Sequence, residues 1–574
     1  MNEKFVYPNA ELHNSRTKFS MAHTHKTSLD HSFLYPIDVI EVVPGDTFEL
    51  KVASLIRMSN PIAPIMDNIE MHVAAYYVPL RLLWENYEEF EGVNKTGAWY
   101  NSNNTYTSVP VTKYGSAGNN DTMKVKSGDL LEMLGYPVGE DLCKVDDKNA
   151  GSILPLRAYF RIWNEHYRNA NVSAPVAVDY SANDRVFVGV NMRDAEMSDI
   201  NTLAAIGLND DNSYTPSSGV SYWLMRLAKF PDVFTKCLPA PQRGPSVEYL
   251  PDLLPVDVGV AHATTAGGHL TFNLANGNAY GSGDRNLALI NNFLGSTTSA
   301  SSSDLNNYVV PNNLYADLNK VSKTINDLRL MFQIQKYFEK DARYGVKNIA
   351  EKTLGHFGVR SPDATIQQSQ YLGELNFHIN VEQVLSTAGA ADDSTSKLGQ
   401  PGANSVTAGK GDLGTFSFTE RGYIIIVAGA RHDHTYANAT LPYLLHKELF
   451  DFYDPLFANI GEFPVSQYVA GATDGQSTNI FGYQEAFYDY RFLPSRVTGA
   501  LNPGAVGSLN YWTLADAPGA RQLNEAFIYE NRDSISRALT TGSSGPDYIV
   551  DFYFMHTAVR PMPLFSIPGL VDHH

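Results

Sequence analysis

The sequence is poor in cysteine and in basic residues, and both shortages exclude classes of protein. Cys143 and Cys237 are the only cysteines in 574 residues. They are too few for a disulfide framework and indicate a chain that folds in a reducing cytoplasm, with one structural disulfide left open. The 61 acidic residues outnumber the 43 basic ones, and the net charge is −18. This charge argues against a protein whose whole surface binds nucleic acid, although a local basic patch is compatible with it.

Long apolar runs are also missing. The longest one, residues 423–430, is far shorter than a membrane-spanning helix requires. Residues 1–14 contain no apolar stretch of the kind that signal peptides carry. We therefore expect a soluble protein that is not secreted.

Turn-forming and strand-forming residues are abundant. The chain has 43 glycines, 30 prolines, 33 tyrosines and 28 phenylalanines, a composition typical of strands joined by loops. Apolar and polar side chains alternate over residues 47–52 and 69–77, which predicts strands with one buried face. Pro79 should end the second strand or lie on a sheet edge, because proline cannot donate to a ladder. Residues 423–427 are apolar without alternation and predict a strand buried on both faces. Such strands need a second sheet to cover them, so the sequence favours a mainly β sandwich.

Two helices interrupt this pattern. Residues 155–169 and 324–339 place apolar side chains along one stripe at helical spacing. Thr324 is expected to cap the second helix. Beside the stripe of the first helix lie Arg157, Arg161 and Arg168. They could contact phosphate, but pairing with surface carboxylates is the more usual role.

Three segments carry little core pattern. Residues 1–35 mix charged residues with histidines and predict an extended N-terminal arm. The remainder, residues 36–574, is expected to form one β domain. Within it, residues 245–312 are rich in Gly, Ser and Asn, contain a single basic residue, Arg285, and predict a surface-exposed insertion. The prolines of residues 555–574 predict an extended C-terminal tail.

Two short runs that contain histidine resemble metal-binding motifs. His23 and His25 could share an ion on an extended chain, but no cysteine or carboxylate at ligand spacing accompanies them. His432 and His434 flank Asp433, the inventory of a site with two histidines and one carboxylate. On a strand Asp433 points away from both histidines. We therefore expect a strand end or a subunit contact at this run, and we predict neither a metal nor a cofactor.

Motifs spread over nearly the whole chain match one family. They include MAHTHKT at residues 21–27, PGDTF at 44–48, PIMDN at 64–68, VPLRLLW at 78–84, FGYQE at 481–485, PSRVTG at 494–499, and the run at 559–573. Arg431, Asp433, Thr435 and Tyr436 add a further pattern. These motifs resemble the major capsid protein of microviruses, small icosahedral bacteriophages with single-stranded DNA, and most closely the gokushovirus branch.

The resemblance implies a fold and an assembly. The fold is an eight-stranded antiparallel jelly roll with long loop insertions and a few helices. The assembly is a T=1 capsid of sixty copies, built in the cytoplasm of a bacterial host around a circular single-stranded DNA genome. The implied partners are a small basic DNA-packaging protein, a minor or pilot protein, a scaffolding protein during assembly, and a host surface receptor.

Candidate contact residues follow from this reading. The arm would run along the shell interior, where its basic side chains would touch DNA phosphate; they are Lys4, Arg16, Lys18 and Lys26. The insertion at 245–312 would form the protrusion at the threefold axes and face the host. Its candidate residues are Leu250, Leu253, Leu254, Arg285, Leu287 and Phe293.

Two other function classes are open from the residues alone. The acidic charge and many aromatics would permit a carbohydrate-active β enzyme, but no motif places a pair of carboxylates across a substrate. Cys237 lacks a specified base and is expected to be a small buried thiol rather than a nucleophile. A receptor-binding adhesin is the other alternative, and it is disfavoured because no secretion signal is seen. Electron microscopy separates the three classes, since only a capsid protein forms closed icosahedral particles.

Overall fold

The computed structural model describes two compact units of the chain. One comprises residues 1–241 and 340–574, and the other comprises residues 242–339. The described residues are 15–92, 109–111, 127–138, 151–176, 178, 180, 224–244, 325–360, 362, 367–385, 401–472, 479–517, 519, 521–542 and 545–565, with strands β6–β11 described as backbone only. Predicted sites at Lys4, Cys143, Leu250, Leu253, Leu254, Arg285 and Thr324 lie outside the described residues.

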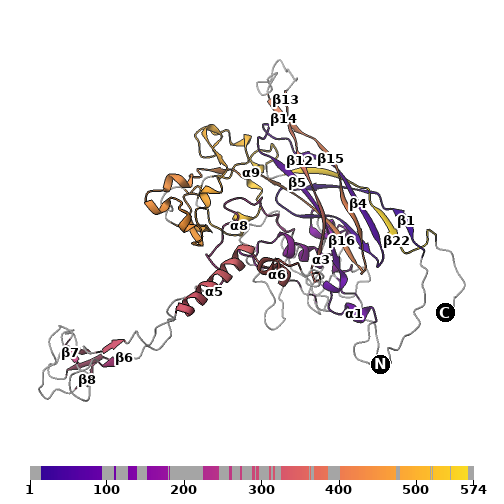
Figure 1. Ribbon diagram of the computed structural model, residues 1–574. Coiled ribbons are helices and arrows are strands. Elements are labelled where there is room, and N and C mark those ends of the chain that lie inside the picture. Colours follow the sequence, from indigo (N-terminus) through magenta and orange to yellow (C-terminus); the bar gives the residue numbers. More distant parts are fainter. Residues whose placement is uncertain are drawn as a thin grey trace, which may run out of the picture. The chain divides into compact units, whose positions relative to one another are not determined.

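A six-stranded antiparallel sheet forms one half of a β sandwich in the larger unit (Figure 1). Its strands are β1 (Thr17–Ser20), β2 (His23–Leu29), β4 (Thr47–Met58), β15 (Thr407–Ser417), β21 (Tyr548–Phe554) and β22 (Thr557–Arg560). β1 and β2 follow one another and pair with β22 and β21, which together line one edge of β4. β15 pairs with the other edge of β4. The six strands therefore occupy four rows.

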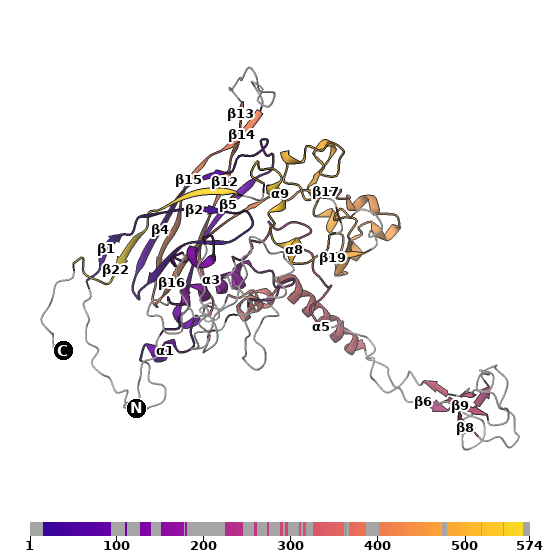
Figure 2. The same ribbon diagram turned by 180° about the vertical axis from the view of Figure 1, so that it is seen from behind.

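A four-stranded antiparallel sheet forms the other half. Its order is β12 (Gln370–Ile379), β5 (Ile69–Pro79), β16 (Gly422–His432) and β3 (Tyr35–Val42). Each pair of successive strands that share one line in the sheet, β1 with β2 and β21 with β22, counts as one row. In chain order the eight rows are then β1/β2, β3, β4, β5, β12, β15, β16 and β21/β22. Row 1 pairs with row 8, row 2 with row 7, row 3 with row 6, and row 4 with row 5. This nesting of one long hairpin is the jelly-roll arrangement. The predicted mainly β, antiparallel jelly-roll class is confirmed, and Figure 2 shows the six-stranded sheet from behind.

The inner faces of the two sheets form the main apolar core. In β4 the predicted alternation is confirmed, with Phe48, Leu50 and Val52 fully buried and their neighbours partly exposed. β5 ends at Pro79, as predicted, but its one-sided pattern was wrong. Tyr76 and other side chains of its second face are buried as well, because a helix covers that face.

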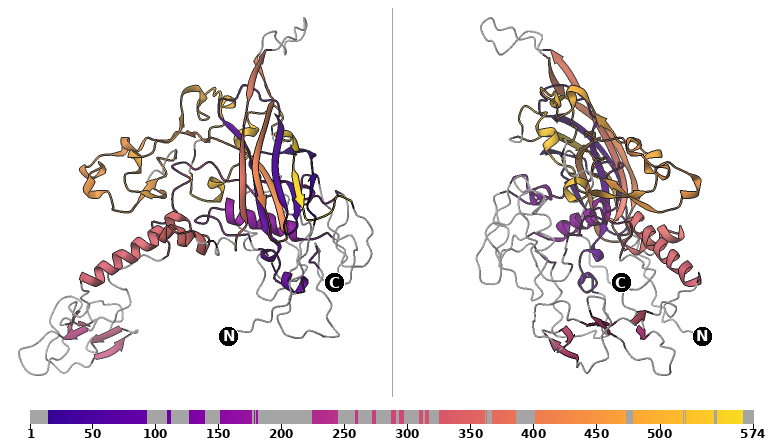
Figure 3. Two further views of the ribbon diagram at one scale, coloured as in Figure 1. Left: turned by 45° about the vertical axis from the view of Figure 1, so that its right-hand side comes forward. Right: turned by 90° about the vertical axis from the view of Figure 1, so that its left-hand side faces the viewer.

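The covering helix is α3 (Leu154–Ile162), which continues as the π-helical turn η2 (Trp163–Tyr167) and confirms the helix predicted at 155–169. Its residues Leu156, Tyr159 and Phe160 pack with Tyr76 of β5 and Val427 of β16. Figure 3 shows α3 against the lower part of this sheet. The second predicted helix is α5 (Ile325–Tyr344). No helix in the described part of the chain is long and apolar enough to cross a membrane.

Strands β12 and β15 approach closely where the two sheets meet. Gly411 of β15 faces Leu375 of β12, and a Cβ atom at Gly411 would lie 2.4 Å from Leu375 Cδ2. Gly409 faces Phe377 in the same way. A Cβ atom at either position would overlap the facing side chain, which would have to move, so glycine allows the two strands this close approach.

The remaining elements are short. In the larger unit they are α1 (Tyr87–Phe90), α2 (Leu130–Met133), α6 (Ile349–Phe357), α8 (Glu525–Ile528), α9 (Asp533–Ser536), β13 (Val381–Leu385), β14 (Pro401–Ser405), β17 (Tyr436–Ala437), β18 (Glu462–Ser466), β19 (Ile480–Glu485) and β20 (Arg496–Val497), with several 3-10 turns. In the smaller unit β6 (Val258–Val260) pairs with β11 (Leu314–Ala316), β7 (Phe272–Leu274) with β10 (Val309–Pro311), and β8 (Leu287–Ile290) with β9 (Phe293–Ser296).

Candidate functional site

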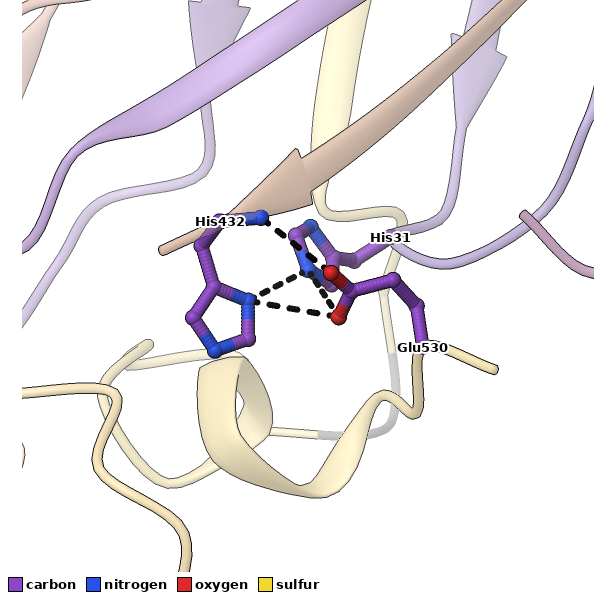
Figure 4. A group of neighbouring side chains, drawn as sticks. All are labelled: His31, His432 and Glu530. Atoms are coloured by element: carbon purple, nitrogen blue, oxygen red, sulfur yellow. Dashed lines mark hydrogen bonds and ion pairs between the residues drawn. The ribbon is translucent and has the colours of Figure 1, made fainter. Parts of the chain in front are cut away.

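Three distant segments bring histidine and carboxylate side chains together in the interior of the larger unit. His31 lies in the turn after β2, His432 is the last residue of β16, and Glu530 follows α8. All three side chains are fully buried. We call this group, shown in Figure 4, the histidine–glutamate cluster.

Backbone contacts fix the turn that carries His31. Ser32 adopts a φ of 83°, a conformation that residues other than glycine rarely take. Its amide donates to the carbonyl of Ala430 in β16 at 3.2 Å, and its own carbonyl accepts from the amide of Leu227 at 2.8 Å. The amide of His31 donates to Asp547 Oδ2 at 2.8 Å. These contacts hold the His31 ring against the end of β16.

The ring nitrogens and the carboxylate point toward one another. His31 Nε2 lies 3.0 Å from His432 Nδ1, and Glu530 Oε2 lies 3.5 Å from the first atom and 3.4 Å from the second. Glu530 Oε2 is buried and has no hydrogen-bond partner among the described residues, and the same is true of Nε2 of His432. On its other side, Nδ1 of His31 lies 3.0 Å from the hydroxyl of Tyr548.

Three further charged or titratable residues, His434, Asp516 and Lys229, lie next to the cluster. His434 Nε2 lies 3.0 Å from Glu530 Oε1, and its Nδ1 lies 3.3 Å from Asp516, which also pairs with Lys229 at 3.1 Å. Burial acts to lower the pKa of His434, but Glu530 and Asp516 outweigh it and raise the pKa to about 9. Burial and the nearby His434 hold the pKa of His432 well below its ordinary value. Burial acts to raise the pKa of Glu530, but His434 and His432 keep it well below its usual range. The ring of His432 is thus neutral and Glu530 is ionised.

The sequence identified only part of this cluster. Asp433 is exposed and accepts from Asn68 Nδ2 at 3.1 Å, so it points away from both neighbouring histidines as predicted. β16 ends at His432, which confirms the strand end. His31 and Glu530 were missed, because no local spacing relates them to His432.

The other histidine pair does not form a shared site. His23 Nε2 lies 3.3 Å from Asp38, whereas His25 Nδ1 lies 2.6 Å from the carbonyl of Ile37. Cys237 is free and buried, and burial raises its thiol pKa to about 12. The prediction of a small buried thiol is therefore confirmed.

The arginines of α3 serve the fold of their own chain. Arg157 is fully buried and donates to the carbonyl of Leu83 at 3.0 Å. Arg161 pairs with Glu165 at 2.9 Å, in line with the predicted carboxylate pairing. Arg168 donates to the carbonyl of Ser173 at 2.7 Å. The alternative of a phosphate-binding stripe is wrong for Arg157, whose guanidinium is inaccessible to a ligand.

Three of the four candidate DNA-contact residues lie in the described part of the chain. Arg16, Lys18 of β1 and Lys26 of β2 are exposed, and Lys26 makes a loose ion pair of 3.9 Å with Asp551. Among the candidates in the insertion, Leu287 and Phe293 lie in the β8–β9 hairpin, whose side chains are not described.

Two neighbouring loops, around residues 446–456 and 489–493, expose several large apolar side chains. They are Leu449, Phe450, Leu456, Tyr490 and Leu493, and Leu449 and Leu456 are 79% and 88% exposed. The loops contact each other, since His446 pairs with Asp489 at 3.2 Å and the rings of Tyr453 and Tyr490 lie 5.9 Å apart. We call these five residues the apolar loop surface. Exposed apolar patches of this kind mark contacts with other proteins.

Comparison with known proteins gives a consistent result over the whole chain. Residues 10–570 match the family model described as "Capsid protein (F protein)". Capsid protein VP1 of Chlamydia phage 1 is 33% identical, covering 97% of this chain and 96% of the relative. Capsid protein VP1 of Spiroplasma virus 4 is 30% identical, covering 99% and 100%. Capsid protein VP1 of Bdellovibrio phage phiMH2K is 29% identical, covering 97% and 96%. The chain therefore belongs to the capsid protein (F protein) family, and it is a self-assembling structural component of a virus capsid, not an enzyme.

Proposed function

We propose that this protein builds a T=1 shell of sixty copies around a circular single-stranded DNA genome. Membership of the capsid family, together with a jelly roll whose connecting loops expose apolar side chains, supports the proposal. A shell protein must cover such side chains with copies of itself, and a contact closes into a shell only if its angle is right. Assembly takes place in the cytoplasm of the bacterial host, with a scaffolding protein and a minor or pilot protein as partners.

The apolar loop surface is the contact between copies in this proposal. Charging it with Leu449→Glu and Leu456→Glu should leave folded subunits that form no particles, because buried unpaired carboxylates are costly at an interface. Ile62→Glu is the matched control, since Ile62 is also an exposed apolar residue but lies in the connection between β4 and β5, outside the apolar loop surface and the proposed DNA-facing surface. Electron microscopy and circular dichroism of the purified variants separate failed assembly from failed folding. Normal particles from the double variant would refute this contact.

The outer face of the six-stranded sheet is the proposed DNA-facing surface. Lys18 and Lys26 are exposed there, and Tyr553 of β21, paired in register with Thr24, is 44% exposed. Lysine contacts to phosphate and base stacking on tyrosine bind single-stranded DNA without reading its sequence. A chain of net charge −18 cannot neutralise a genome alone. We therefore include a small basic DNA-packaging protein and counterions in the proposal.

Residues 245–312 are the proposed host-facing element. They fall within the separate unit at 242–339, so the jelly roll does not need them for its sheets. A segment with one basic residue is poorly suited to nucleic acid and better suited to a surface receptor.

A further inference from the structure

We propose that the histidine–glutamate cluster is a binding site for a divalent transition metal ion, with Zn²⁺ as the best match. His31 Nε2, His432 Nδ1 and Glu530 Oε2 are the three protein ligands. The site is structural and joins three segments of the chain that are distant in sequence. It shares no residue with the surfaces proposed for assembly, DNA and host.

The geometry of the three atoms matches a tetrahedral ion. Zinc binds imidazole nitrogen and carboxylate oxygen at about 2.0–2.2 Å, so two ligands of a tetrahedron lie about 3.3 Å apart. The observed separations are 3.0, 3.4 and 3.5 Å. Figure 4 shows that the two rings and the carboxylate converge on one point from three different chain segments.

Hydrogen bonding alone leaves the cluster unsatisfied. One proton shared between His31 and His432 accounts for their 3.0 Å contact. It leaves Glu530 Oε2 buried without a donor, although two ring nitrogens lie within 3.5 Å. Buried carboxylate oxygens without partners are costly. A cation between the three atoms removes this cost, since it accepts a lone pair from each ligand.

The surroundings orient the ligands in the way metal sites require. The hydroxyl of Tyr548 contacts His31 Nδ1 at 3.0 Å and thereby leaves Nε2 to face the cluster. His434 contacts Glu530 Oε1 at 3.0 Å and leaves Oε2 free. Such outer contacts fix the ring orientation and tune the affinity of metal ligands.

Burial decides the role of the ion. Each of the three side chains has no exposed surface, so no substrate can reach a metal held there. The ion instead ties the turn after β2 to the end of β16 and to the segment after α8. Metal binding to the folded state alone stabilises that state.

The test is metal content and metal-dependent stability of the full chain. Protein stripped with a chelator, reloaded with Zn²⁺ and dialysed should retain about one zinc per chain and melt at a higher temperature than stripped protein. Co²⁺ loaded in the same way should give the visible absorption of a tetrahedral nitrogen–oxygen site. His432→Asn and Glu530→Gln should each weaken Zn²⁺ binding at least about tenfold.

Two further variants keep the test decisive. His378→Gln is the matched control, because His378 is an exposed histidine that pairs with Glu70 at 3.1 Å, and it should bind zinc normally. Tyr548→Phe preserves the buried ring and should bind zinc about tenfold more weakly even if the ligand variants fail to fold. Wild-type protein that retains no zinc and melts unchanged would overturn the proposal. Undiminished binding in Tyr548→Phe and in the folded ligand variants would do the same, because the metal would then lie elsewhere.

Discussion

His31 and His432 are 401 positions apart in the chain, and their ring nitrogens lie 3.0 Å from each other. The contact follows from the jelly-roll nesting, which places the end of row 1 beside the end of row 7. It links the first segment of the sandwich to one of its last strands.

The C-terminal tail is predicted to act in assembly rather than in folding. Removing residues 561–574 should leave the jelly roll intact, because the last ladder residue is Arg560 of β22, but should prevent particle closure. Met562, Leu564 and Phe565 are exposed on their own subunit and need a neighbour to cover them. Replacing these three with serine should cause the same defect at full chain length. Normal particles from either variant, seen by electron microscopy, would contradict the prediction.

The basic residues of the arm are predicted to contact the genome. Neutralising Lys4, Arg16, Lys18 and Lys26 to glutamine should lower the DNA content of particles and their stability at low salt, because each lost phosphate contact removes a salt-dependent contribution. Arg360→Gln is the control, since Arg360 is exposed after α6, outside both the arm and the apolar loop surface. Unchanged DNA content in the quadruple variant would show that the arm is not the contact.

The insertion is predicted to be dispensable for the shell. Replacing residues 245–312 with a short Gly/Ser linker should give assembled particles that fail to adsorb to the host, because closing a loop of different length changes the free energy of folding little. Adsorption assays on purified particles provide the measurement. Survival of adsorption would rule out the host-facing role.

A side chain at Gly411 is predicted to disturb the close approach of β12 and β15. Gly411→Val should lower the free energy of unfolding by about 1–3 kcal/mol, because its Cβ would overlap Leu375. Lys410→Val at the adjacent, exposed position is the control and should change stability by less than about 0.5 kcal/mol. Denaturant unfolding of both variants tests the pair, and equal stability would argue against the close approach.

The contact between β2 and β3 is predicted to weaken in alkali. The hydrogen bond to Asp38 raises the pKa of His23 from 6.5 to about 9, so its contribution is complete below pH 6.5 and is lost as the pH rises through 9. Burial acts to raise the pKa of Asp38, but its hydrogen bonds with His23 and His556 lower it below the usual value. The contribution of the ionised Asp38 to stability is therefore lost only in acid. The effect is modest because the His23 side chain is 43% exposed. His23→Gln should therefore reduce the fall in melting temperature between about pH 6 and pH 9, whereas His378→Gln should not. An identical fall in both variants would contradict the assignment.

The strands and helices that depend on local patterns of apolar residues could be predicted from the sequence. The alternation of Phe48, Leu50 and Val52 predicted β4, and the apolar stripe of residues 155–169 predicted α3, because strand and helix periods are local. The second face of β5 was predicted to be polar, since Tyr76 and His72 do not look apolar in sequence. Both are buried, because α3 and η2 lie against them. The hydroxyl of Tyr167 hydrogen-bonds with Nε2 of His72 and accepts from the hydroxyl of Tyr76.

The histidine–glutamate cluster shows where sequence reasoning ends. His432 was recognised as part of a metal-like run, but its neighbour Asp433 faces solvent. Its actual partners come from a turn near the N-terminus and from a segment 98 positions downstream. The tertiary fold brings them together, and no local pattern in a single sequence indicates that they meet.

A reconstruction of the assembled particle with its genome tests the central claim most directly. The account predicts closed icosahedral particles of sixty copies, with the apolar loop surface buried between subunits and DNA against the outer face of the six-stranded sheet. Purified full-length protein that stays monomeric under assembly conditions, or that forms only open filaments, would contradict it.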